Sequence, residues 1–161
     1  FTLLLDAVKL IPIAKRPKII IAGDGIRADE VRQLMMDAVE SGEIEAEVSG
    51  AFTPIQFQEL VKQLDVMFAL YPPERGNIWQ GALPVKMFDA AANGIPSIVN
   101  SGCLMGELAE SEEIGKAVAW DDAMATSNAM LELRGTTVEL KISSQREKKR
   151  FLSAVLPLLD D

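Results

Sequence analysis

The chain has 161 residues, a length that fits one domain, and 48% of them are hydrophobic, which is enough for a substantial core. A net charge of −8 without a basic stripe argues against a nucleic-acid partner, and the absence of histidine excludes Ser-His-Asp catalysis, Cys-His catalysis and His-ligated zinc. The sequence contains no apolar run of about 18 residues, so no transmembrane segment is expected. Cys103 is the single cysteine and cannot form an intramolecular disulfide, which favours a cytoplasmic location.

The first half of the chain alternates helical and strand-like patterns. Apolar residues at helical spacing predict a helix over residues 3–10, and the run Lys-Ile-Ile-Ile-Ala predicts a strand over residues 18–22 that is buried on both faces. The turn Gly23-Asp24-Gly25 ends that strand, and residues 28–40 form an amphipathic helix pattern. A second strand is expected over residues 45–48. Thr53-Pro54 then marks the start of a helix that extends to residue 64.

The second half continues the alternation. Residues 66–70 predict a third strand, residues 71–82 a long loop, and residues 84–93 a helix that ends at Gly94. Short strands are expected over residues 97–99 and 117–119, followed by helices over residues 121–133 and 143–156. The block at residues 146–150 is basic but contains Glu147, and we interpret it as the solvated face of the last helix rather than as a phosphate-binding arm.

This alternation predicts an α/β fold: a Rossmann-like, doubly wound parallel sheet with helices on both faces. Such sheets bind ligands at the carboxyl ends of their strands. The loops to inspect are therefore the four that follow strands, at residues 23–27, 50–53, 71–83 and 100–106. We expect residues 1–161 to form a single domain.

Three groups of residues are candidates for a ligand site. Gly23, Asp24 and Gly25 precede a helix whose N-terminal amides suit a phosphate, although, taken alone, they are better explained by a plain tight turn. Lys86 and Asp89 lie three residues apart and share a helix face, where they can bind a phosphate and a ribose or simply form an ion pair. Trp79, in the loop beside Gly81, can pack on a sugar or base, anchor a partner, or only fill the loop.

Residues 83–96, Leu-Pro-Val-Lys-Met-Phe-Asp-Ala-Ala-Ala-Asn-Gly-Ile-Pro, resemble a signature of the group 1, family 4-type glycosyltransferases, which have the GT-B fold. Members of that family often show Leu-Pro-x-Lys-x-Phe-Glu-x-x-Ala-x-Gly-x-Pro. The order of the preceding elements is also similar: a strand that ends in Gly-Asp-Gly, a helix, a strand that ends in glycine, and a further helix. The resemblance covers roughly residues 3–119 and identifies the chain with the C-terminal, donor-binding half of such a hexosyltransferase.

The resemblance implies a role for each candidate. Lys86 would contact the diphosphate of a nucleotide-sugar donor, Asp89 would hold the ribose hydroxyls, and the turn with Phe52 would lie near the nucleobase. The segment that contains Gly81, Ala82, Leu83 and Pro84 would pass close to the diphosphate or the sugar, and the turn at Gly23 to Gly25 belongs to the same donor site. Many members carry two glutamates eight positions apart, whereas this chain has Gly81 and Asp89 at those positions.

The resemblance implies no cofactor beyond the nucleoside-diphosphate sugar itself. No metal site is expected, because no cluster of carboxylates occurs in a candidate loop. The acceptor would bind to a separate N-terminal domain, so the isolated domain would bind donor and transfer nothing. Two other interpretations stay open from the sequence. The chain can belong to a nucleotide-sugar epimerase, which shares the two-domain layout and the diphosphate leaving group, or to a non-catalytic interaction domain that kept the fold.

Overall fold

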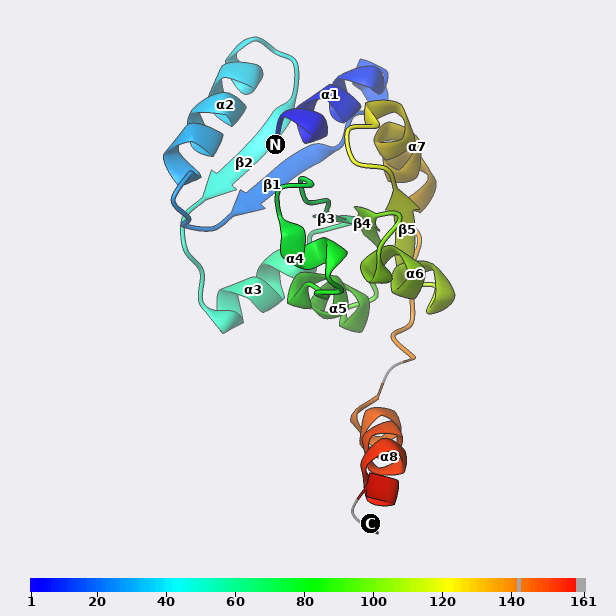
Figure 1. Cartoon of the computed structure of the whole chain (residues 1–161). Coiled ribbons are helices and arrows are strands. Elements are labelled where there is room, and N and C mark those ends of the chain that lie inside the picture. Colours follow the sequence, from blue (N-terminus) through cyan, green and yellow to red (C-terminus); the bar gives the residue numbers. More distant parts are fainter. Residues whose placement is uncertain (142, 159–161) are drawn as a thin grey trace.

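The computed structural model describes residues 1–141 and 143–158, and it shows an α/β protein with two parallel sheets (Figure 1). The strands are β1 (Lys18–Ala22), β2 (Glu45–Ser49), β3 (Met67–Ala69), β4 (Ser97–Asn100) and β5 (Gly115–Val118). β1 and β2 form one sheet, and the other has the order β3-β4-β5. In register, Ile20 of β1 lies opposite Glu47, and Ile98 of β4 lies between Phe68 and Lys116. The α/β class and the parallel strand pairing are as predicted.

The helices connect and cover these strands. They are α1 (Thr2–Leu10), α2 (Ala28–Glu40), α3 (Pro54–Val61), α4 (Gly76–Trp79), α5 (Val85–Ala92), α6 (Leu104–Ser111), α7 (Ala123–Leu133) and α8 (Ser144–Val155), with 3-10 turns η1 (Ile13–Lys15) and η2 (Leu156–Leu158). In the described part of the chain, none of them has the length and apolar character that a membrane-crossing helix needs. Local signals place several ends: Thr53 and Gln56 form a capping box before α3, and Gly94 after α5 has a positive φ of 79°.

The sheet β3-β4-β5 is covered by helices on both faces. Neighbouring residues of β4 show this, because side chains alternate across a strand. Ile98 packs in a cluster with Leu3 of α1 and Ala129 of α7, whereas Val99 packs in a cluster with Met87 of α5 and with residues of α6. All four residues of β4 are buried, so this strand is the centre of the core.

The sheet β1-β2 differs from the prediction, because its two strands are covered on one face in the described structure. Ile19 and Ile21 pack with α1 and α2 in a single cluster. On the other face Lys18 and Glu47 are exposed and form a surface ion pair, and Ile20 is only half-buried. The expectation of a strand buried on both faces was therefore wrong for β1. Three consecutive isoleucines allow a strand to be buried on both faces. Burial also requires other elements to pack on the second face, and the isoleucine run does not determine whether they do.

Two helices lie in segments that the sequence did not predict to be helical. Within the long loop after β3 lies the single turn α4, and after β4 lies α6, whose N-cap Cys103 makes no side-chain capping bond. Gly106 of α6 explains why that helix fits here. A Cβ atom at this position would lie 2.4 Å from the backbone oxygen of Asn100, so only glycine allows the helix to lie this close to the end of β4.

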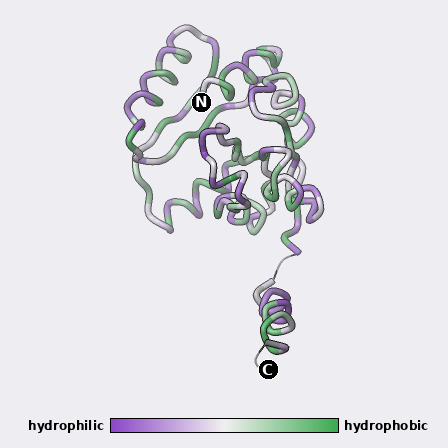
Figure 2. The backbone as a smooth tube through the Cα atoms, in the orientation of Figure 1, coloured by the Kyte–Doolittle hydropathy of each residue, from purple (hydrophilic) through white to green (hydrophobic). Residues whose placement is uncertain are grey.

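Helix α8 extends away from the rest of the molecule (Figure 1). Hydrophilic and hydrophobic residues are mixed along its length (Figure 2), and the apolar side chains of Phe151, Leu152 and Leu156 are exposed. Its first turn is joined to the body by a two-point ion pair between Arg146 and Glu112. The basic face of α8 is solvent-exposed, as the sequence predicts.

Candidate functional site

The four loops that follow the strands meet in two pairs. At the carboxyl end of the β1-β2 sheet, the amide of Gly23 donates a hydrogen bond to the carbonyl of Gly50 over 3.0 Å. At the carboxyl end of the other sheet, the loop after β3 is fastened to β4 through Tyr71 and Asn100. Parallel strands bring their carboxyl ends to the same edge, so each pairing follows from the strand order.

Asn100 fixes the backbone of Tyr71 at two points. Its Oδ1 accepts a hydrogen bond from the Tyr71 amide over 2.8 Å, and its Nδ2 donates one to the Tyr71 carbonyl over 2.9 Å. The Asn100 side chain is fully buried, and these two bonds satisfy its amide group where water cannot reach. The loop therefore leaves β3 in a defined direction, with the half-buried Tyr71 ring beside the start of α5.

Lys86 lies in the first turn of α5 and points toward β3 rather than into water. Its Nζ donates a hydrogen bond to the backbone carbonyl of Phe68 over 2.9 Å and lies 4.8 Å from the centroid of the Tyr71 ring. A cation over an aromatic face is attracted by the negative face of the ring. Neither partner carries a formal negative charge, so the ammonium group is held by a carbonyl dipole and a π face alone.

The pKa of the Lys86 ammonium is lowered from its ordinary value of 10.5 to about 8, mainly by burial and also by the positive charge of Arg75. Both causes disfavour the charged form, because the group has lost water and a second cation is near. A lysine in this state is stabilised by any anion that comes within contact distance, and at neutral pH it still carries most of its charge.

The ion pair between Lys86 and Asp89, one of the two interpretations from sequence, is not formed in the described structure. Lys86 reaches Phe68 instead, and the carboxylate of Asp89 makes no hydrogen bond or ion pair with the described residues. Asp89 is half-buried on the same helix, and its backbone carbonyl accepts a bond from the side chain of Asn93. Its side chain is therefore available to accept hydrogen bonds from a ligand.

The segment before α5 runs from Gly81 to Pro84 and has a constrained backbone. Gly81 has a φ of 93°, which a residue with a side chain rarely adopts, and Pro84 is the N-cap of the helix. Ala82 packs against the core cluster of α5 and α6, whereas Leu83 is 37% exposed. This segment directly precedes the helical turn that contains Lys86, and its Ala82 packs on the core.

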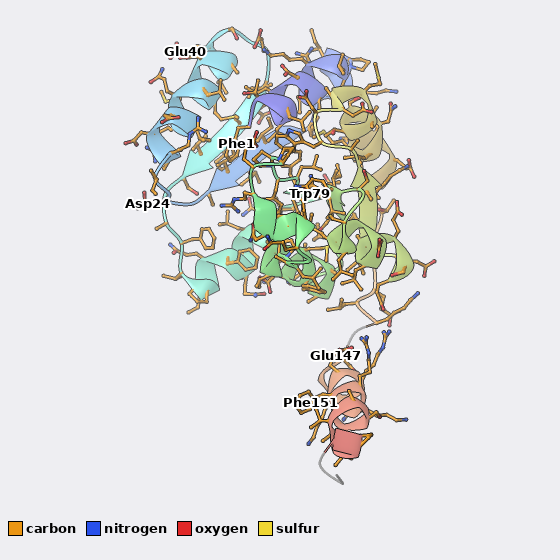
Figure 3. The ribbon with its side chains drawn as sticks, viewed as in Figure 1. Phe1, Asp24, Glu40, Trp79, Glu147 and Phe151 are labelled. Carbon is orange, nitrogen blue, oxygen red and sulfur yellow. The ribbon has the colours of Figure 1, made fainter. Side chains whose placement is uncertain are left out.

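Trp79 lies at the end of α4 near the middle of the view in Figure 3, and 42% of its surface is exposed. It also packs on the loop after β4, since a Cβ atom on Gly102 would lie 4.0 Å from the Trp79 ring. Asp24, by contrast, lies at the outer edge of the molecule at the end of β1, well to the side of Trp79 (Figure 3). The predicted site residues therefore fall into two groups, one at each sheet.

The group at the β1-β2 sheet consists of the glycine turn and an aromatic pair. Asp24 and Gly25 are exposed, and a Cβ atom at Gly23 or Gly25 would meet nothing within 4 Å. The φ of 151° at Gly23 is what favours glycine there, rather than close approach of another part of the chain. Phe52 is 43% exposed and stacks on Phe57 of α3, with ring centroids 5.8 Å apart, so it presents an apolar surface at this edge.

Three residues near Lys86 were not singled out from sequence: Tyr71, Arg75 and Asn100. Asn100 had a signal, because a polar residue at the end of an otherwise apolar buried strand needs a specific partner. Arg75 had none. Its guanidinium lies 5.3 Å from the centroid of the Tyr71 ring, a contact between residues of one irregular loop that no periodic pattern reveals.

Two surface hollows of about 190 and 350 Å³ lie away from the candidate site, the first beside Phe1 and Arg27 and the second between α2 and β2, and neither is lined by Lys86 or Asp89. Among residues 1–141 and 143–158, no three His, Cys, Asp or Glu side chains are grouped in a way that could hold a metal ion.

No protein-family model matches the chain, and the curated proteins contain no significant match to it.

Proposed function

We propose that this chain is the donor-binding domain of a cytoplasmic glycosyltransferase, which transfers a sugar from a nucleoside-diphosphate sugar to an acceptor held by a separate domain. The observation that carries the proposal is the environment of Lys86. A half-buried ammonium group without a carboxylate partner in the described structure, at the carboxyl end of a parallel sheet, is arranged to receive an anion. The sequence signature around residues 83–96 supports the same assignment.

The chemistry of sugar transfer explains what such a site would do. The leaving group is a nucleoside diphosphate, and negative charge develops on it as the glycosidic bond breaks. Lys86 would stabilise that charge, together with backbone amides at the start of α5, in a partly desolvated place where a charge acts more strongly than in water. Its Nζ would then donate hydrogen bonds to phosphate oxygens instead of to the carbonyl of Phe68. A charged acceptor would thus replace a neutral one.

The other candidate residues have roles consistent with a nucleotide. The free carboxylate of Asp89, one helical turn beyond Lys86, would accept hydrogen bonds from the two ribose hydroxyls. The exposed ring of Phe52 offers a surface on which a nucleobase can pack. The acceptor would be held by the separate domain, so we expect this chain alone to bind donor and to transfer no sugar.

The test is a calorimetric and thermal-shift titration of the chain with UDP, GDP, ADP and inorganic pyrophosphate. We expect one nucleotide to bind, with stabilisation of about 2.7 kcal/mol at about one hundred times its dissociation constant. Lys86→Ala should abolish binding of both the nucleotide and pyrophosphate. Asp89→Asn should weaken binding of the nucleotide but leave the affinity for pyrophosphate unchanged, because pyrophosphate has no ribose.

Lys62→Ala is the matched control, since Lys62 is an exposed lysine at the C-cap of α3 that is paired with Glu59. It should bind like the wild type. If no nucleotide binds, or if Lys86→Ala binds as well as Lys62→Ala does, the donor-site proposal is wrong, and a non-catalytic interaction domain becomes the better explanation.

A further inference from the structure

We propose that Arg75 is a second anion-binding residue of this site, and that Arg75 and Lys86 together bind the two phosphate groups of a diphosphate around the ring of Tyr71. This inference rests on the proposed donor site and adds to it a residue that lies outside the sequence signature. It is carried by the geometry of three side chains and by the absence of an acid among them.

The first step is that both cations lie on one aromatic ring. The guanidinium carbon of Arg75 is 5.3 Å from the centroid of the Tyr71 ring, and Nζ of Lys86 is 4.8 Å from the same point. The backbone that carries the ring is held in place, because Asn100 bonds both the amide and the carbonyl of Tyr71. Tyr71 is therefore the common neighbour of two positive charges.

The second step is that no carboxylate balances these charges in the described structure. The chain has 24 acidic residues against 16 basic ones, and the described residues form nine ion pairs. Neither Arg75 nor Lys86 belongs to any of the nine. In a chain with an excess of acids, two cations at one ring that have no acidic partner among the described residues can accept a negative charge from a ligand.

The third step is electrostatic. Two like charges held at one ring repel each other, and the charge of Arg75 contributes to the lowered pKa of Lys86. An anion between them replaces this repulsion with two attractions. A diphosphate suits the pair better than a single phosphate, since each cation can then contact its own phosphoryl group, and the planar guanidinium can donate two parallel hydrogen bonds.

The position of Arg75 allows it to close on such a ligand. It is exposed, it precedes the short helix α4, and its side chain makes no hydrogen bond or ion pair with the described residues. Lys86, by contrast, comes from the first turn of α5 and is half-buried. The ligand would therefore contact a half-buried cation on the helix and an exposed one on the loop.

The experiment measures the affinity of pyrophosphate, orthophosphate and the nucleotide that binds best. Trp79 lies four residues from Arg75 and serves as a fluorescent reporter in a Trp120→Phe background, which leaves it as the only tryptophan. The variants are Arg75→Ala, Arg75→Lys and Lys86→Ala. Arg134→Ala is the matched control, because Arg134 is an exposed arginine at the end of α7.

We expect Arg75→Ala to weaken pyrophosphate and nucleotide binding by about ten- to a hundredfold, the usual effect of losing a charged hydrogen bond. The affinity for orthophosphate should fall less, because orthophosphate can contact only one of the two cations. Arg75→Lys should restore part of the affinity, since it keeps the charge but not the bidentate geometry. Arg134→Ala should leave all three affinities unchanged.

A second measurement separates binding from a merely structural stacking of Arg75 on Tyr71. Acetylation of Lys86 can be followed by mass spectrometry at pH 8 in the presence and absence of pyrophosphate. We expect pyrophosphate to protect Lys86 in the wild type at concentrations that no longer protect it in Arg75→Ala. Equal protection in both proteins would show that Arg75 only packs on the ring.

The outcomes distinguish this inference from the proposed function. If Lys86→Ala loses the nucleotide while Arg75→Ala binds like Arg134→Ala, the donor site stands and the role of Arg75 is overturned. If the wild type binds neither nucleotide nor pyrophosphate, both proposals are wrong.

Discussion

Lys86 keeps a positive charge in a half-buried place, where its partners among the described residues are a carbonyl oxygen and an aromatic ring. Such an arrangement weakens the folded state, because removing an ammonium group from water is unfavourable unless an anion replaces the lost solvation. Residues that reduce stability in this way tend to be found at functional sites. The candidate site is therefore recognisable from the energetics of one residue, independently of any sequence signature.

The lowered pKa of Lys86 predicts how the stability of the protein depends on pH. The pKa of Lys86 is about 8 in the folded chain against an ordinary value of 10.5, so the unfolded chain binds more protons between these values. The free energy of unfolding should therefore rise as the pH increases from about 8 to about 10.5. Lys86→Met should lack this contribution and be more stable than the wild type at pH 7, by about 1–3 kcal/mol.

Urea denaturation of both proteins at pH values from 7 to 10 is the measurement, and the difference between the two curves is the quantity to compare. Other lysines titrate in both proteins and cancel in that difference. Two curves that stay parallel over the whole range would contradict the assignment of a lowered pKa to Lys86.

At the scale of the element, the sheet β3-β4-β5 depends on close backbone contact. Gly115 begins β5 beside Ser97 of β4, and a Cβ atom at Gly115 would lie 2.2 Å from the backbone oxygen of Ser97. Because the neighbour is backbone rather than a flexible side chain, the two strands would have to separate to admit even a methyl group.

Gly115→Ala is therefore expected to lower the free energy of unfolding by about 1–3 kcal/mol, the usual cost of overpacking. Gly25→Ala is the matched control, since a Cβ atom there would meet nothing within 4 Å and the backbone has no positive φ. It should change stability by less than about 0.5 kcal/mol. Equal effects of the two substitutions in chemical denaturation would mean that β4 and β5 can adjust to the added methyl group.

At the scale of the whole molecule, the two sheets share one core although they are not joined by strand pairing. Helix α1 contributes Leu4, Leu5 and Val8 to the cluster over β1, and Leu3 to the cluster over β4. Phe68 of β3 and Met130 of α7 pack against both clusters. Helix α8 is outside this arrangement, since none of its residues belongs to the three core clusters.

A chain that ends at Lys141 should therefore unfold within about 2–4 °C of the full-length protein. The truncation removes α8 and with it only surface contacts, such as the ion pair between Arg146 and Glu112, which water screens. Thermal unfolding followed by circular dichroism is the measurement. A much larger decrease in Tm would show that α8 contributes to the stability of the body.

The sequence by itself determined the α/β class and most of the elements. These elements are encoded by signals that act within a few residues along the chain. Examples are the isoleucine run of β1, the helical spacing of α2, the Thr53 cap of α3 and the glycine after α5. Local signals also placed Lys86 in the first turn of a helix.

Only the tertiary structure decided what surrounds Lys86. Its contacts come from Phe68, 18 positions away, and from Tyr71, which is held by Asn100 at a separation of 29 residues. It also decided that β1 is covered on one face and that Gly106 lets α6 lie against β4. Burial, a pKa and the absence of a charged partner depend on which distant segments meet, and parallel strands bring such segments together only after the chain has folded.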